Sequence, residues 1–195
     1  MNFINIYANL IRVALIGFSI YHIYKKQFKL IIATATVFIL SFLLTFLEWA
    51  INIKLDVFGS FLYYTIILMS FYFGNALKYY DKYAWWDRLL HFICGILFVS
   101  FGIALAGKVA GLNKFNILFF SFTFSIALHG IWEITEYVLD CIMHTNHQRW
   151  QRIHNSQNHV PENAIQPAGL VDTMKDTIMC TISSLITCVV WWFLI

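Results

Sequence analysis

The stretch that decides the fold is "LIIATATVFILSFLLTFLEWAI", Leu30–Ile51, in which Glu48 is the single charged residue. A helix of about 20 apolar residues crosses the roughly 30 Å hydrocarbon layer of a bilayer. A helix also pairs its backbone N–H and C=O groups internally, which lipid requires because it offers them no partner. The sequence therefore predicts a transmembrane helix here.

Similar runs recur along the 195-residue chain, which is 60% apolar and 12% charged and has only two prolines. This composition is far from that of a soluble globular protein. It predicts an all-α, polytopic integral membrane helix bundle, with residues 1–195 forming a single transmembrane domain. The six expected spans are Asn5–Tyr24, Leu30–Ile51, Phe58–Leu77, Trp85–Ala106, Phe115–Ile142 and Asp172–Ile195.

Basic residues are distributed unevenly between the two sides that six spans would create. One side has Lys25, Lys26, Lys29, Lys78, Lys82, Arg88, Arg149, Arg152 and Lys175, and the other has Lys54, Lys108 and Lys114. The positive-inside rule places the richer side in the cytoplasm and both termini on the non-cytoplasmic side. Because these basic residues lie in scattered membrane-edge loops, the net charge of +3 gives no indication of nucleic-acid binding.

The one long connection covers residues 143–171, is polar and contains four histidines, and we expect it to be cytoplasmic. A connection of this length is either a lid or binding loop or a disordered linker. The sequence leaves these two interpretations open.

Acidic and histidine side chains gather at the same predicted face. Asp87 and His91 open the fourth span, four such residues close the fifth, and Asp172 and Asp176 open the sixth. Residues four apart share one side of a helix, so each group forms a narrow stripe. The four residues of the fifth span are His129, Glu133, Glu136 and Asp140.

Charges inside a bilayer cost about 2.5 to 3.5 kcal/mol each on insertion scales, so such stripes need compensation. The acids could be protonated, could pair with Arg88, Lys175, Arg149 or Arg152, or could bind a metal. Six acids stand against two bases on the same helical segments, which favours one or two divalent cations. A mixed carboxylate and imidazole set suits Zn²⁺, Mn²⁺ or Fe²⁺, and an all-oxygen subset suits Mg²⁺.

Three segments carry a family resemblance: "WWDRLLHF" (85–92), "HGIWEITEYVLD" (129–140) and "LVDTMKDT" (170–177). Together they resemble the YjdF-type family of uncharacterised bacterial inner-membrane proteins. The resemblance implies a multi-pass protein of the bacterial cytoplasmic membrane and supplies no established reaction. It carries the family's acidic and histidine positions onto Asp87, His91, Glu133, Glu136, Asp172 and Asp176, while His129, Asp140 and the histidines of the long connection go beyond the family's pattern.

Our hypothesis from the sequence is a metal-dependent hydrolase or transferase that acts on a membrane lipid or other amphiphile at the cytoplasmic face. The expected metal ligands are the six residues that match the family pattern. Glu136 or Asp140 is the expected general base. Arg88, Arg149 and Arg152 are the residues expected to bind a phosphate. The sequence gives no oligomeric state.

Two other classes stay open. An ion or proton transporter would use intramembrane acids and histidines as a relay, although no proline interrupts a predicted span and no halves mirror one another. A non-catalytic scaffold or immunity-type protein would use the same charges only to hold helices together.

Overall fold

The computed structural model describes residues 3–150 and 166–194, and within these ranges the chain forms helices and no strand. Six helical segments of 20 to 30 residues are long and apolar enough to cross a membrane. They are α1 (Phe3–Tyr24), α2 (Phe28–Ala50), α3 (Val57–Ile67) continuing into the π-helical η1 (Leu68–Ala76), α5 (Trp86–Ala106), α6 (Lys114–Met143) and α7 (Ala168–Leu194). The short α4 (Tyr79–Lys82) precedes α5. The prediction of an all-α, multi-pass membrane protein is confirmed.

One helix boundary differs from the sequence prediction in a way that matters for the site. The sixth span begins at Ala168, four residues before the predicted start, so Asp172 lies in its second turn and not at its N-terminus. Helix α6 ends at Met143 and α7 begins at Ala168, so both ends of the predicted loop 143–171 lie in helices, and its residues 151–165 lie outside the described residues. The second half of the third span is π-helical, which apolar periodicity did not predict.

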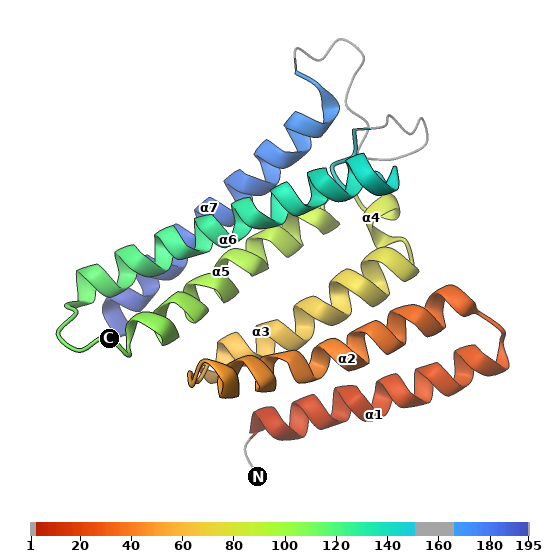
Figure 1. Ribbon diagram of the computed structural model, residues 1–195, viewed down its shortest axis with the longest axis horizontal. Helices are drawn as coiled ribbons and strands as arrows, with labels where there is room; N and C mark the ends of the chain where they lie inside the picture. The colour runs from red at the N-terminus through yellow and green to blue at the C-terminus, as the bar shows by residue number, and fades with distance from the viewer. Residues whose placement is uncertain (1–2, 151–165, 195) are drawn as a thin grey trace. The chain divides into compact units, whose positions relative to one another are not determined.

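The chain divides into two compact units, Met1–Tyr80 and Asp81–Ile195. In the first unit, α1 packs on α2 and α3, and α2 also packs on η1 (Figure 1). Tyr63 on α3 donates a hydrogen bond to the Leu40 carbonyl of α2 at 2.7 Å. The prediction that residues 1–195 form a single domain stays a prediction.

The positively charged guanidinium of Arg12 lies near the middle of the first span. Arg12 Nε donates to Ser41 Oγ at 3.1 Å, and its Nη2 donates to the Ser41 carbonyl at 2.7 Å. Its Nη1 donates to Asn9 at 3.1 Å, and the guanidinium lies 4.1 Å from the ring centroid of Phe42. Hydrogen bonds and a cation–π contact therefore hold this charge at the α1–α2 interface.

The π-helical segment connects to a buried histidine. His22, only 4% exposed, lies with its Nε2 3.0 Å from the Tyr72 hydroxyl of η1 and its Nδ1 2.8 Å from Gln27 Oε1. Both ring nitrogens thus have neutral partners, as a buried imidazole requires. We interpret His22 as a structural residue that fixes η1 against α1.

The second unit is a three-helix bundle in which α5 contacts both α6 and α7, and α6 also contacts α7 (Figure 1). Two glycines of α5 allow the close approach. A Cβ at Gly95 would collide with Ser183 Oγ and would lie 2.5 Å from the Cys180 carbonyl oxygen of α7. A Cβ at Gly102 would lie 2.6 Å from Ser121 Cα on α6. Small residues at such crossings are the usual means of helix packing in membranes.

Hydroxyl groups fill the interior of this bundle. Ser125 Oγ of α6 and Ser184 Oγ of α7 lie 2.8 Å apart, and both are fully buried. Ser184 also donates to the Cys180 carbonyl one turn earlier at 2.7 Å. These buried hydroxyls are therefore satisfied by short local bonds, as lipid surroundings demand.

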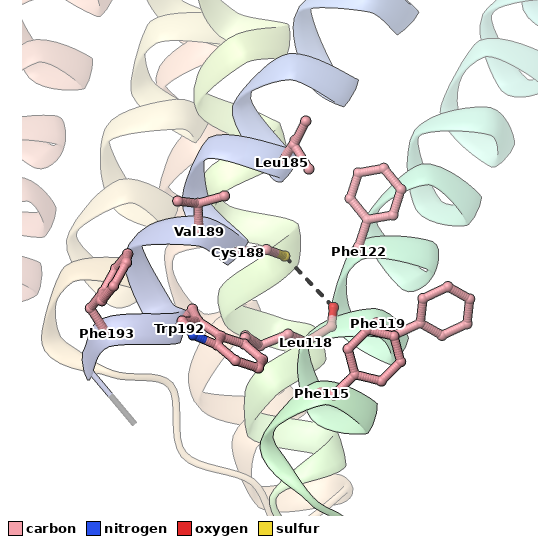
Figure 2. Close-up of a pocket in the computed structure, with 9 residues that line it drawn as sticks. All are labelled: Phe115, Leu118, Phe119, Phe122, Leu185, Cys188, Val189, Trp192 and Phe193. Atoms are coloured by element: carbon pink, nitrogen blue, oxygen red, sulfur yellow. Dashed lines mark hydrogen bonds between the residues drawn. The ribbon is translucent and has the colours of Figure 1, made fainter.

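A groove of about 360 Å³ lies between the first turns of α6 and the last turns of α7 (Figure 2). Its nine lining residues carry no charge, and Phe115, Leu118, Phe119 and Phe122 form its α6 side. The Cys188 thiol of α7 donates to the Leu118 carbonyl across it at 3.6 Å. The groove is lined by uncharged residues, whereas acids and histidines collect at the other end of the same two helices.

Candidate metal site

The first turns of α5 provide one acid and one histidine. Asp87 lies in the first turn, where the positive end of the helix dipole stabilises a carboxylate. His91 follows four residues later on the same face, so its Nε2 lies 3.5 Å from Asp87 Oδ1. His91 is 6% exposed, which places its imidazole inside the bundle.

Helix α7 brings a buried acid to the same point. Asp176 is 3% exposed, and its Oδ2 lies 3.9 Å from His91 Nε2. One ligand atom from each of Asp87, His91 and Asp176 lies within 4.8 Å of the other two. This separation is compatible with three ligands of one cation.

Helix α6 adds a second histidine and a second buried acid. His129 Nε2 lies 3.5 Å from Glu133 Oε1, one turn along the helix. The ring of His129 meets the ring of His91 edge to face, with centroids 5.1 Å apart. His91, His129 and Glu133 form a second group whose ligand atoms lie within 4.8 Å of one another. His91 belongs to both groups and therefore stands at the centre of the cluster.

One carboxylate oxygen of the cluster lacks a hydrogen bond within the described part of the chain. Glu133 Oε1 is buried and has no hydrogen-bond partner among the described residues. Buried carboxylate oxygens without partners are rare because desolvation is costly. This oxygen lies 3.5 Å from His129 Nε2. The unpaired oxygen belongs to one of the three residues of the second group that could bind a metal.

The segment after α6 contributes a cation and an amide. Arg149 Nε donates to Asp87 Oδ2 at 3.2 Å and lies 3.9 Å from Asp172 Oδ1. Gln148 Nε2 donates to Thr173 Oγ1 of α7 at 3.0 Å. Asp87 thus presents one oxygen to His91 and the other to Arg149.

The two residues predicted as general bases lie at the margin. Glu136 is half-buried, and its Oε1 accepts a hydrogen bond from Trp132 Nε1 at 2.8 Å. Asp140, although 5% exposed, is used by the segment that follows α6 and accepts bonds from Thr145 and from backbone N–H groups.

A cavity of about 340 Å³ lies beside the last turn of α6. It offers room for a polar group between the last turn of α6 and the segment that follows it. Its lining residues are Tyr137, Asp140, Cys141, His144, Gln148 and Trp150.

The sequence offered four basic residues that could pair with the acids, and among those that the structure describes only Arg149 does so. Arg88 is half-buried and Lys175 is exposed, and neither forms an ion pair with the cluster within the part of the chain that the structure describes. Arg152, together with His154 and His159 of the connection, lies outside the described residues.

Sequence reasoning placed His129 in the acidic stripe but left it out of the ligand set. The structure places it against the ring of His91 and against Glu133, and its Nε2 lies 3.2 Å from Thr177 Oγ1. A signal was available, because His129 and Glu133 have the same four-residue spacing as Asp87 and His91.

The fold and the cluster together define a class: a multi-pass, all-helical membrane protein with histidines and carboxylates gathered at one end of a three-helix unit. The chain belongs to the family described as "Predicted membrane protein (DUF2238)", whose family model matches residues 6–195. This match confirms the resemblance to an uncharacterised membrane-protein family. No curated protein and no solved structure matches the chain.

Proposed function

We propose that this protein is a metal-dependent membrane hydrolase or transferase that acts on a lipid or another amphiphile. The observation that carries the proposal is Glu133 Oε1, a buried oxygen without a hydrogen-bond partner among the described residues, in a group of ligand atoms that includes two imidazoles. A divalent cation would satisfy that oxygen. It would also offset the excess of acids over the single arginine that reaches them.

The donor set narrows the choice of metal. Two histidines with one glutamate form a set that suits catalytic Zn²⁺ or non-haem Fe²⁺, and Mn²⁺ accepts the same ligands. Mg²⁺ fits less well because it prefers oxygen ligands throughout. His91, His129 and Glu133 would be the primary ligands, with Asp87 and Asp176 completing the coordination from α5 and α7.

Arg149 supports a role for an oxyanion in the substrate. Asp87 Oδ1 is the oxygen nearest His91, and Asp87 Oδ2 is the oxygen bonded to Arg149, so one carboxylate would connect cation and guanidinium. Such an outer partner orients a metal ligand. The Arg149 guanidinium would then be separated from the cation only by the Asp87 carboxylate. From this position it could bind a phosphate oxygen of a substrate held at the cation.

The proposed chemistry divides between the cation and the chain. A bound divalent cation activates water or polarises a phosphoryl or carbonyl oxygen. Glu136, half-buried one turn beyond Glu133, is our candidate general base. The 340 Å³ cavity at the end of α6 gives space for a headgroup while acyl chains remain in lipid. The excess of basic residues on this side supports a location at the cytoplasmic face of a bacterial inner membrane.

Transport is the second candidate, because buried hydroxyls continue beyond the cluster through Ser125 and Ser184. Close packing argues against ion passage along that row. At Gly95 and Gly102 there is no space even for a methyl group between α5 and its neighbours. A hydrated ion is far larger, so we prefer the enzyme.

The proposal is tested with purified protein in vesicles of phosphatidylethanolamine and phosphatidylglycerol, depleted of metal and then supplied with Zn²⁺ or Mn²⁺. We expect release of a water-soluble headgroup product that depends on the metal and falls at least 100-fold in Glu133→Gln. Glu48→Gln is the matched control, because Glu48 lies in the first unit and bonds the Leu55 N–H. Equal product formation by wild type and Glu133→Gln would contradict the proposal.

A further inference from the structure

The segment after α6 contains a turn with an unusual backbone conformation. His144, which follows the last residue of α6, and Arg149 both have positive φ, 53° and 50°. Residues other than glycine pay a steric cost in this region, so such a turn persists only where other contacts enforce it. Between these two residues lies the segment Thr145–Gln148.

Asp140 supplies the enforcing contacts. Its Oδ1 accepts hydrogen bonds from Thr145 Oγ1 at 2.7 Å and from the His147 N–H at 2.8 Å, and it lies 3.0 Å from His147 Nδ1. Its Oδ2 accepts from the Gln148 N–H at 2.9 Å. One buried carboxylate therefore satisfies three residues of the segment at once.

The last residue of this segment, Gln148, and the residue that follows it, Arg149, are those that reach the other helices. Gln148 donates to Thr173 on α7, and Arg149 donates to Asp87 on α5. The Asp140 carboxylate binds the backbone N–H of Gln148, which directly precedes Arg149. Asp140 therefore fixes the backbone position from which the Arg149 side chain extends. The contacts form a chain from α6 through the turn to α5 and α7.

We infer that Asp140 is a positioning residue, and that it acts through Gln148 and Arg149 by holding the turn Thr145–Arg149 against α5 and α7. This role differs from that of a general base. A general base needs an accessible lone pair at the reaction centre. Asp140 is only 5% exposed, and its two carboxylate oxygens make four contacts with the segment that follows α6. In the site that we propose, Asp140 sets where the guanidinium meets an oxyanion.

The position of the turn is tested without metal by thiol cross-linking with a short bifunctional maleimide. Gln148→Cys and Thr173→Cys replace residues whose side chains are joined by the 3.0 Å hydrogen bond from Gln148 Nε2 to Thr173 Oγ1, in a chain whose exposed Cys141 is changed to serine. We expect rapid cross-linking, slowed in a graded series. Loss of one hydrogen bond in Thr145→Val slows it about 2- to 10-fold, Asp140→Asn slows it more, and Asp140→Ala slows it most.

Glu136→Gln is the matched control, since it changes an acid one turn earlier on the same helix without touching the turn. Equal cross-linking rates in Asp140→Ala and in the parent would overturn the inference. A graded loss with unchanged helix content in Asp140→Asn would support it and would exclude global unfolding as the cause.

A second readout rests on the proposed function. With Co²⁺ as a spectroscopic probe, Asp140→Asn and Arg149→Gln should change the visible spectrum in the same way, and the double variant should add nothing further. Additive changes would contradict action through Arg149. If cross-linking follows the expected series but no Co²⁺ binds, the inference on Asp140 stands and the metal proposal fails.

Discussion

Gly95→Ala tests whether close packing of α5 and α7 builds the site. The added methyl would collide with Ser183 Oγ and lie 2.5 Å from the Cys180 carbonyl oxygen. Carbon contacts are optimal near roughly 3.5–4.0 Å, so the helices must separate by about 1 Å. The obstacle is partly backbone, which cannot rotate away as a flexible side chain could.

Gly130→Ala is a matched control on α6, because a Cβ there has nothing within 4 Å among the described residues. Both substitutions gain the same helix propensity, about 1 kcal/mol, so the comparison isolates packing. Overpacking typically costs about 1–3 kcal/mol. At about 2–4 °C per kcal/mol, Gly95→Ala should melt about 2–12 °C below Gly130→Ala.

The assay is thermal unfolding of both variants in the same detergent, followed by tryptophan fluorescence. Gly95 lies one turn beyond His91 on the same face, so the shift that lowers the melting temperature should also weaken metal binding. Equal melting temperatures of the two variants would refute the packing argument. Lower stability with unchanged metal affinity would separate the site from the helix contact.

Three further predictions concern single contacts. In the Zn²⁺-loaded protein, Arg149→Gln should weaken binding of inorganic phosphate about 10- to 100-fold, the worth of a charged hydrogen bond, while Lys175→Gln on the exposed face of α7 changes it little. Tyr72→Phe leaves the buried Nε2 of His22 without its partner and should lower the free energy of unfolding by about 1–3 kcal/mol, measured by denaturation in mixed micelles. Asp56→Ala removes the N-cap of α3 and should cost about 0.5–2 kcal/mol in the same assay.

The controls keep each test specific. Tyr24→Phe removes an exposed hydroxyl and should leave stability unchanged, and Asp56→Asn retains a capping oxygen. No loss of phosphate binding in Arg149→Gln would remove the oxyanion role. No effect of Tyr72→Phe would show that His22 does not depend on η1.

The fold followed from the sequence because lipid leaves few options. A run such as Leu30–Ile51 has no partner for its backbone except itself, so length and apolarity alone predicted a helix. The start of α7 was predicted four residues late. Ala168–Val171 is helical although "AGLV" has no charge pattern to mark it, and the predicted boundary depended on the acid at position 172.

The π-helical segment escaped prediction for a different reason. Six of the nine residues 68–76 are apolar or aromatic and none is charged, so a change of helical period leaves no trace in the pattern. What distinguishes the segment is tertiary: Tyr72 meets His22, and a Cβ at Gly74 would overlap the ring of Tyr80.

The candidate site was predictable where spacing within one helix defined it. Asp87 with His91 shows this, and His129 with Glu133 follows the same rule. Arg149 was one of four basic residues that could pair with the acids. The sequence could not identify it as the partner, because its position depends on a turn with two residues at positive φ. Such conformations follow from the contacts of Asp140 and not from local propensity.

A divalent cation bound at His91 is the central feature of the proposed site. Metal content is measured by mass spectrometry of purified protein after incubation with Zn²⁺ or Mn²⁺ and dialysis, for wild type, His91→Ala and the control Glu48→Gln. We predict stoichiometric metal in wild type and Glu48→Gln, and its loss in His91→Ala. Wild-type protein without stoichiometric metal, or equal metal in His91→Ala, would contradict the central claim.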